Sequence, residues 1–392
     1  MPPSAGRSDG TEVLDTPEQL RGLWPEWERL DAGASWSLND SAWARAWMET
    51  AAVDTRETAA VYTRETAAMD ARDTPAERNG SAPDGDSGAV VVRDAGIVSA
   101  VAPLVRSTRR GARYTLPGCE AGEPLDFSYA DEDALSELIH GIVRLGIPIE
   151  IPRLPAEGPT LHALRRAYRP AGAVVVRPAP SSPAIELDET WEEPERKLSA
   201  RRRSDLRRAM RRAQSWGEVS VTVESPGTHD FDATFELALR VEAAGWKGRS
   251  RTALLTAGRQ GEAFRRFFTS IAAAGRLRAV WLWIGGEPAA VQLAAERGGH
   301  FCLLKVGYDE RFGRCSPGQL LQLESIRAAA ARGLASYEFL GNPEPWTRVW
   351  TRYERPCVAV RAFPATPGGM LSLFSDAATH LGSRVRAFRY RS

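Results

Sequence analysis

The stretch KVGYDERFGRCSPGQLL, residues 305–321, joins a predicted strand to a predicted helix. An apolar run ends at Tyr308, a polar loop with Arg311 and Arg314 follows, and SPG at 316–318 opens a helical pattern. Proline suits the first helical position, and glycine lets a ligand approach the backbone closely. Amide groups at a helix start have no intrahelical acceptor, and the helix dipole adds positive charge there. We therefore predict an anion site at this junction.

Phosphate is the anion that this stretch suits best. Guanidinium groups pair with phosphate oxygens through two parallel hydrogen bonds, and a serine hydroxyl can cap the helix or donate to the same oxygens. The predicted cradle consists of Arg311, Arg314, Ser316, Pro317, Gly318 and Gln319. A plainer interpretation stays open on the motif alone, because short glycine-containing loops have low specificity. In that interpretation the triplet only begins a helix and the arginines are solvated.

The elements around this stretch recur in a similar order in both halves of the chain. In the second half we predict a basic helix, a strand, two helices, a hairpin, a strand, a helix, a strand and a last strand, over 193–216, 218–224, 230–244, 259–275, 276–297, 300–309, 317–332, 336–341 and 357–363, then a C-terminal helix. The first half predicts elements over 16–31, 40–51, 89–106, 133–146, 149–154, 160–171 and 173–178. This repetition predicts two α/β lobes, residues 1–180 and 181–392, joined at the Pro/Ser-rich APSSPA.

One segment interrupts the first lobe. TRETAA occurs at 55–60 and again at 63–68, and a tail rich in Gly, Ser, Pro and Asp follows. A repeat this short is no solenoid unit, and the tail has little apolar surface to bury. We predict a low-complexity insertion in a surface loop over 53–88, without a function of its own.

Composition excludes several classes of protein. The chain has 392 residues, 43% hydrophobic content and a formal net charge of +1, which favour folded domains over a protein that mainly coats nucleic acid. Its four cysteines and five histidines are dispersed without metal-ligand spacing, so we expect no metal. We find neither a signal-peptide pattern nor an apolar stretch long enough to span a bilayer. We therefore expect a cytoplasmic protein without a membrane partner.

Several stretches, taken in order, resemble the GNAT superfamily of acyltransferases and, within it, the FemAB-like branch that includes acetyltransferases associated with polysaccharide or cellulose biosynthesis. They are RRRSDLRRAMRRAQSWGEVSV, the segment from Glu242 to Trp246-Lys247-Gly248, GGEPAAVQL, KVGYDERFGRCSPGQLL and YEFLGNPEPW, with SWSLNDSAWARAW and Leu125-Asp126-Phe127 in the first half. The resemblance implies two tandem GNAT-like lobes, each a mixed sheet flanked by helices. It also places the acyl-CoA site in the second lobe.

The activity that this resemblance implies is N-acylation. The donor is acetyl-CoA or another acyl-CoA, and the acceptor is an amine of a small molecule, sugar or peptide. The backbone of 290–293 is expected to pair with the pantetheine arm. Relatives differ from this chain at three places: proline stands at 317 for the first glycine of the family's loop, Glu338 replaces an aspartate, and Thr347-Arg348 stands where relatives carry a lysine.

Two alternatives remain. An aminoacyl-tRNA-dependent FemAB-type transferase would grip tRNA with the run 196–212, which holds nine Lys or Arg and one acid. We favour it less, because the same arginines could pair with Glu192, Glu193 and Glu195. The other alternative is a non-catalytic accessory protein of a polysaccharide or natural-product pathway.

Three residues are candidates for proton transfer. Glu338 lies on an apolar strand, where partial desolvation would make it a better general base, although an edge carboxylate facing solvent fits equally well. Asp309 could serve instead, but capping the following loop is its plainer role. Tyr308 could protonate the departing thiolate or simply pack. Cys315 is a conceivable nucleophile that nothing requires.

The acceptor and acyl pocket is predicted from four residues: Trp246, Lys247, Lys305 and Trp346. A flat aromatic ring and a cation after the helix 230–244 could line such a pocket, or could simply anchor the helix end. Lys305 lies on an apolar strand, where a buried charge needs a partner. We expect it to pair with Glu338 or Asp309, to reach a phosphate or carboxylate, or to point into solvent.

Overall fold

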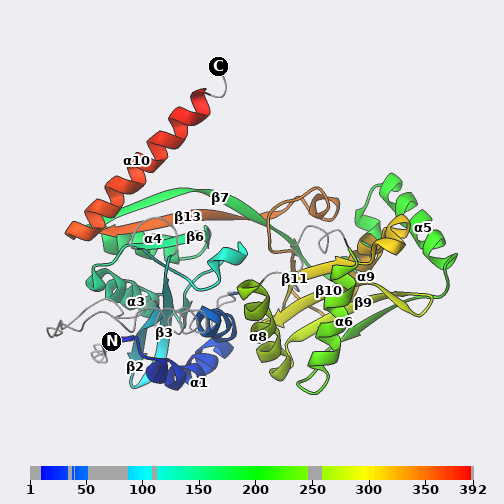
Figure 1. Ribbon diagram of the computed structural model, residues 1–392, viewed down its shortest axis with the longest axis horizontal. Helices are drawn as coiled ribbons and strands as arrows, with labels where there is room; N and C mark the ends of the chain where they lie inside the picture. Colours follow the sequence, from blue (N-terminus) through cyan, green and yellow to red (C-terminus); the bar gives the residue numbers. More distant parts are fainter. Residues whose placement is uncertain are drawn as a thin grey trace, which may run out of the picture. The chain divides into compact units, whose positions relative to one another are not determined.

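The computed structural model describes residues 10–33, 38, 40–51, 87–107, 113–245 and 258–389 (Figure 1). Its chain forms two compact units, one from residues up to Pro180 together with those from Pro356 onward, the other from Ser181 to Arg355. The sequence assigned all of 181–392 to the second lobe, whereas the final strand and helix join the first unit. They do so because the strand pairs with residues of the first unit, such as Val360 with Ile151.

The first unit is a mixed sheet with helices. Its strands are β1 (Thr11–Leu14), β2 (Ser87–Asp94), β3 (Ile97–Arg106), β4 (Tyr114–Thr115), β5 (Ser128–Tyr129), β6 (Ile149–Pro155), β7 (Gly172–Glu186) and β13 (Glu354–Pro364). They follow the order β1-β2-β3-β4-β6-β13-β7, with β5 on β3. The helices are α1 (Pro17–Gly33), α3 (Glu132–Leu145), α4 (Thr160–Tyr168), α10 (Pro367–Arg389) and the short η1 (Cys119–Ala121), and residues 41–51 are helical as well.

Local sequence explains the best-predicted elements of this unit. Ala95 and Gly96 both have positive φ, 51° and 78°, which gives the turn twist that joins β2 to β3. Asp131 accepts the Ala134 amide and begins α3, and Gly146 ends that helix in the left-handed conformation. The predicted insert 53–88 lies largely outside the described residues, and its predicted end is wrong because β2 begins at Ser87.

The expected connection at APSSPA is a strand instead. β7 runs through it, although Pro180 and Pro183 have no amide to donate. Their carbonyl oxygens still accept hydrogen bonds, from Arg153 Nε at 3.0 Å and from the Phe339 amide at 3.0 Å. The prolines therefore mark the place where the two units meet in the sequence without ending the strand.

Two buried polar groups stand out in the first unit. Asp126 accepts hydrogen bonds from the Thr160 hydroxyl and the Phe127 amide, each 2.7 Å long. Burial raises the pKa of this carboxyl to about 7. Asp376 of α10 forms ion pairs with three arginines: Arg113, Arg177 and Arg361. Because Arg177 lies on β7 and Arg361 on β13, these pairs attach the first half of α10 to the sheet.

The second unit is the half that carries the opening stretch. Its strands follow the order β7-β12-β11-β10-β9-β8, where β8 is Val219–Glu224, β9 Leu277–Ile284, β10 Glu287–Arg297, β11 His300–Tyr308 and β12 Ser336–Glu338. The helices are α5 (Ala200–Gln214), α6 (Phe231–Ala243), α8 (Arg259–Ala273) and α9 (Pro317–Ala331), with short turns η2 (Glu189–Glu192), η3 (Pro194–Lys197), η5 (Glu310–Cys315) and η6 (Thr347–Val349).

Helices cover both faces of this second sheet (Figure 1). Successive strand residues point to opposite faces. Gln292 of β10 donates to Gln322 of α9, so α9 covers one face, whereas its neighbours Val291 and Leu293 line a pocket with α6 on the other. The fold class predicted from the sequence, an α/β protein with mixed sheets flanked by helices, is confirmed.

The parallel pair β11–β12 is short. Its register covers only His300–Cys302 against Ser336–Glu338, while β11 continues to Tyr308. Beyond Cys302, no described strand pairs with the edge of β11 that faces away from β10. The sheet therefore opens directly before the loop that leads into α9.

Candidate functional site

The first turn of α9 has an unusual backbone. Ser316 adopts φ 50° and ψ 52°, a left-handed conformation that is uncommon for a residue with a side chain. Its hydroxyl does not cap the helix as predicted, and its carbonyl oxygen accepts the amides of Gln319 and Leu320. Such backbone strain costs free energy, of the order of 1 kcal/mol or more, and is found preferentially at functional sites.

Space is open in front of this turn. A β-carbon added to Gly318 would meet only the Tyr308 ring, at 3.9 Å. Pro317 is buried, whereas Ser316 is exposed and Gly318 and Gln319 are partly exposed. No side chain of the described residues therefore fills the helix mouth.

The two predicted phosphate-binding arginines differ sharply. Arg311 binds the Asp309 carboxylate through Nε at 2.8 Å and also pairs with Glu287 at 2.7 Å. The hydrogen bonds that Arg311 donates, the one to Asp309 having the largest effect and the one to Glu287 the next, raise the pKa of its guanidinium. Arg314 is exposed, and within the described part of the chain it forms no ion pair. Arg314 is thus the better placed of the two for an anionic ligand, and Asp309 acts as the loop cap, accepting the Arg311 amide at 2.9 Å.

The basic helix α5 packs against the same loop. Arg212 donates to the Arg314 carbonyl oxygen at 3.2 Å. Of the acids named as partners of the basic run 196–212, Glu193 pairs with Arg196, which precedes α5, whereas Glu195 pairs with Arg327 of α9. Within the described residues, the only arginine of α5 itself in an ion pair is Arg208, with Asp205. Much of the positive charge of α5 is therefore exposed beside the helix mouth.

An exposed aromatic residue adjoins this basic surface. Trp216, directly after α5, is 57% exposed, and its ring lies 5.3 Å from that of Phe312 in η5. The sequence predicted a basic helix over 193–216, but α5 ends at Gln214 and the Trp216 side chain is exposed. A signal for this existed in Ser215-Trp216-Gly217, since Gly217 adopts φ 147° and turns the chain away from the helix.

The expected pairing of 290–293 with a pantetheine arm is wrong. These residues of β10 already pair with β9 on one side and β11 on the other, for example Val291 with both Trp281 and Gly307. The edge that lacks a described partner strand belongs to β11, over Leu303–Tyr308. An extended ligand with amide groups can pair there as a further strand would.

Glu338 is buried at the short β11–β12 pair. Its Oε1 accepts from the Ser336 hydroxyl at 2.6 Å and from Arg355 Nη2 at 2.9 Å, and Arg355 Nε lies 3.1 Å from both oxygens. His300 contacts the same Ser336 hydroxyl at 2.8 Å, and burial lowers the pKa of this histidine. This arrangement is a closed ion pair, which suits a structural role better than that of a proton acceptor.

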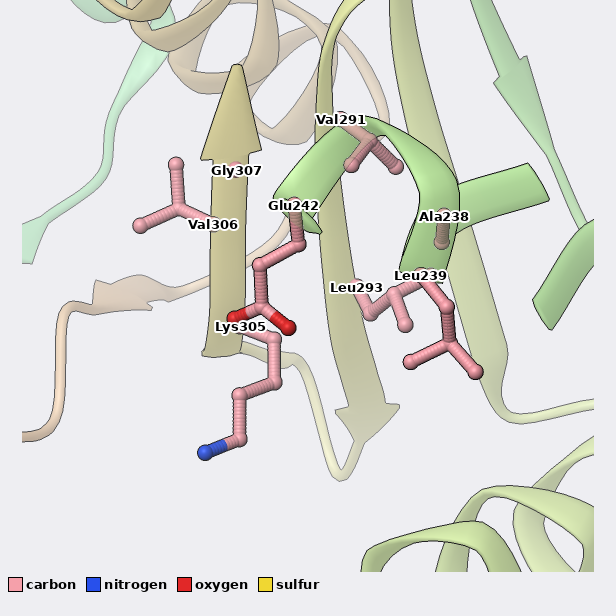
Figure 2. Close-up of a pocket in the computed structure, with 8 residues that line it drawn as sticks. All are labelled: Ala238, Leu239, Glu242, Val291, Leu293, Lys305, Val306 and Gly307. Carbon is pink, nitrogen blue, oxygen red and sulfur yellow. The ribbon is translucent and has the colours of Figure 1, made fainter. Parts of the chain in front are cut away.

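Lys305 has none of its expected partners among the contacts described. Its Nζ lies 3.8 Å from the centre of the Phe264 ring of α8, on the face of the sheet that α6 covers. There it lines a small pocket with Glu242, whose residue is 6% exposed (Figure 2). The other lining residues are apolar: Ala238, Leu239, Val291, Leu293, Val306 and Gly307.

Glu242 was not predicted as a site residue. Its signal in the sequence was a carboxylate in the last turn of α6, where the dipole disfavours negative charge. Trp246 and Lys247 lie outside the described residues. Trp346 packs edge-on against Phe339 at 5.7 Å and donates to Glu344 at 2.7 Å, so its described contacts are structural.

Cys315 does not have the surroundings of a nucleophile. The residue is 1% exposed, and burial raises the pKa of its thiol, opposed only in part by Arg212. A thiolate is therefore disfavoured at this position. Among the described residues there is no group of His, Cys, Asp or Glu that could hold a metal ion, and no helix there is long and apolar enough to cross a membrane.

Comparison with known proteins gives the second unit a family. Residues 200–348 match the family model of an acetyltransferase (GNAT) domain. A search of curated proteins found no match. The match confirms that the GNAT-type domain expected from the sequence is present in this part of the chain.

Several solved structures are similar to this chain at low sequence identity. The C-terminal domain of a putative lysylphosphatidylglycerol synthetase from Agrobacterium fabrum is 12% identical, with 75% of this chain and 88% of that chain covered and a TM-score of 0.50. FemX is 12% identical over 70% of this chain and 87% of its own, with a TM-score of 0.47. A tandem GNAT protein from the clavulanic acid biosynthesis pathway is 12% identical over 91% and 99%, with a TM-score of 0.43.

Proposed function

We propose that this chain, whose second unit contains a GNAT-type acyltransferase domain, transfers an acyl group, with acetyl as the expected one, from CoA to an amine of a small molecule, sugar or peptide. One observation carries the proposal. The open and strained start of α9 lies next to the edge of β11 that lacks a described partner strand. A diphosphate and an extended amide-bearing arm, the two halves of a CoA molecule, fit these two features in that order.

The phosphate end is assigned to the first turn of α9. Amides at a helix start and the positive end of its dipole stabilise a bound diphosphate, and the missing side chain of Gly318 leaves room for it. Arg314 and Arg212 add positive charge at the same place. Arg311 contributes less, because two carboxylates already occupy its guanidinium.

The pantetheine arm is assigned to the edge of β11 from Tyr308 towards Leu303. The Asp309 amide donates to the Ala289 carbonyl oxygen of β10 at 2.9 Å. Every second residue of β11, counted back from Tyr308, therefore directs its amide and carbonyl groups away from β10. Val306 is such a residue. Tyr308 faces the first turn of α9, at the diphosphate end of the arm and away from its thioester end, which favours packing over proton donation as its role.

A titration with acetyl-CoA tests the proposal. We expect calorimetry to show binding to the wild-type chain, and Gly318→Leu to weaken it at least tenfold, because the new side chain would occupy the diphosphate space. Gly227→Leu is the matched control, since a β-carbon at Gly227 meets nothing within 4 Å. No heat of binding with the wild type would remove the proposal and favour an accessory protein without catalysis.

The exposed arginines of α5 support a second candidate, an aminoacyl-tRNA donor. Arg207 and Arg211 are exposed and form no described ion pair, so they could contact tRNA phosphates. Neutralising both would then weaken tRNA binding and flatten its dependence on salt by about two units of slope. If acetyl-CoA binds and tRNA binding is unaffected, CoA is the donor. Both donors are cytoplasmic molecules, and we accordingly propose a cytoplasmic location.

A further inference from the structure

The C-terminal helix α10, red in Figure 1, turns polar side chains inward and large apolar side chains outward. Ser372 and Asp376 are buried, and both bind arginine side chains of the first unit. Leu371 and Phe374 are 72% and 65% exposed, and Met370 is exposed as well. A helix on the surface of a globular domain normally has the opposite arrangement. The packing of the first unit therefore does not explain the apolar residues on this outer face.

The ion pairs of Asp376 fix this orientation of the helix. At 3.6 residues per turn, the midpoint of Leu371 and Phe374 lies nearly opposite the midpoint of Ser372 and Asp376. Rolling α10 to bury the apolar residues would separate the Asp376 carboxylate, whose side chain is buried, from its three arginines, and breaking a buried ion pair is strongly destabilising. The outer face of α10 thus stays exposed in the folded chain, and exposed apolar patches of this kind mark interaction sites.

The sequence of the same helix becomes positively charged towards its end. After Asp376 it contains no further Asp or Glu, and it contains four arginines: Arg384, Arg386, Arg389 and Arg391. Because α10 continues to Arg389, three of these arginines belong to the helix. In the sequence, alternating steps of four and three residues lead on from Leu371 and Phe374 to four apolar positions: Ala378, Leu381, Val385 and Phe388. This pattern is typical of an amphipathic helix with a basic end.

Charge complementarity decides which partner fits this face. A second copy of α10 brings more arginines and no available acid, because Asp376 is the only acid in the sequence of the helix and its carboxylate is already paired. A nucleic acid offers negative charge but no apolar layer. An anionic bilayer offers both, since its phosphate groups lie directly above its acyl chains. Amphipathic helices with arginines beside an apolar face lie in this interface, about 5–10 Å deep.

We propose that α10 binds the surface of an anionic lipid membrane, with Leu371 and Phe374 inserted between the lipids and the arginines of its C-terminal end at the phosphate groups. The ion pairs of Asp376 then attach the first unit to the bilayer. This role is separate from acyl transfer and does not depend on it. We expected no membrane partner, because the sequence has no apolar stretch long enough to span a bilayer. A helix that lies on the surface needs no such stretch.

Sedimentation of the full chain with lipid vesicles tests the proposal. Vesicles of phosphatidylcholine with one-third phosphatidylglycerol should bind the wild type at least about tenfold more tightly than vesicles of phosphatidylcholine alone, because several arginines near an anionic surface add their attractions. This preference should shrink as salt is added. Leu371→Ser combined with Phe374→Ser should weaken binding to the anionic vesicles about tenfold or more, because two apolar side chains no longer enter the lipid.

Charge is tested separately from apolar insertion. Arg384→Gln combined with Arg386→Gln should weaken binding to the anionic vesicles about tenfold and leave the weak binding to phosphatidylcholine vesicles unchanged. Thermal unfolding of both double variants should match the wild type, because Leu371 and Phe374 are exposed and the ion pairs of Asp376 are kept. A loss of vesicle binding in a folded variant is then a loss of the surface itself.

The matched control is Ile97→Ser. Ile97 is 68% exposed and belongs to the first unit, as Leu371 does, but it begins β3 after the hairpin turn. Its loss should leave vesicle binding unchanged. Equal binding of the wild type to both kinds of vesicle, or anionic binding that survives the double serine variant, would overturn the proposal. A dimer in light scattering that the double serine variant dissociates, without vesicle binding, would assign the face to a second copy of the chain instead.

Discussion

The Tyr308 ring lies 3.9 Å from the point where a β-carbon on Gly318 would stand. Within the described part of the chain, no packing contact therefore requires glycine at this position. Glycine inside a helix costs up to about 1 kcal/mol relative to alanine, and less in the first turn. The proposed function explains the missing side chain differently, by the space that a donor diphosphate would occupy.

This relationship predicts opposite signs for stability and binding. We expect Gly318→Ala to leave the free energy of unfolding unchanged or to raise it by about 0.5 kcal/mol, because alanine is the better helix former. The same variant should bind acetyl-CoA several-fold more weakly. Chemical denaturation and calorimetry measure the two quantities, and a variant that is destabilised yet binds normally would show that Gly318 serves the fold instead.

The Glu338–Arg355 ion pair predicts a structural role for Glu338. Replacing it with glutamine leaves Arg355 without its charged partner, and we expect the free energy of unfolding to fall by about 2–3 kcal/mol, less than for a fully buried pair because Arg355 is partly exposed. The affinity for acetyl-CoA, and turnover per folded molecule, should be nearly unchanged. A large loss of turnover without loss of stability would restore Glu338 as the base.

Trp216 predicts a contact with the adenosine end of the donor. Stacking of a base on an aromatic side chain contributes about 1–3 kcal/mol, and Trp216 is exposed beside the basic surface and the loop that holds Arg314. We expect Trp216→Ala to weaken CoA binding about tenfold and to leave the binding of phosphopantetheine, which lacks adenosine, as it was. Equal losses for both ligands would indicate damage to the loop.

Asp126 predicts a pH dependence of stability in the first unit. Burial raises the pKa of this carboxyl from 3.8 to about 7, so the folded state keeps its proton while the unfolded state loses it. Stability should therefore fall as the pH rises from about 4 to about 7, by roughly 4 kcal/mol at most, and level off above.

Asp126→Asn isolates this effect. Its Oδ1 can still accept from Thr160 and Phe127, so the variant should lose the fall between pH 4 and 7 that the wild type shows. Thermal unfolding across this range measures it, and the exposed Glu157→Gln serves as control. The same slope in Asp126→Asn and the wild type would contradict a buried neutral carboxyl.

Local sequence signals predicted most of the secondary-structure elements of the fold. Turn residues with positive φ, such as Ala95-Gly96, and helix signals such as Asp131 and Gly146 act within a few residues, so their elements are readable from the sequence. The strand through Pro180 and the return of residues from Pro356 onward to the first unit depend on distant partners. No local pattern specifies such partners.

For the same reason, the sequence predicted only part of the candidate site. The signal for the helix start at 316–318 is local, and α9 begins at Pro317 as the sequence predicts. Tertiary contacts decide which carboxylate pairs with which arginine. Arg311 pairs with Asp309 and Glu287, and Arg355 pairs with Glu338. Glu242 depends on a close approach to Gly307 that no spacing in the sequence reveals.

A crystal structure of the chain with bound CoA tests the central claim most directly. We predict that the diphosphate oxygens lie within hydrogen-bonding distance of the Gly318 amide at the start of α9, and that the pantetheine amides pair with β11 around Val306. A diphosphate bound elsewhere, with Ser316 and Gly318 still facing empty space, would contradict the account.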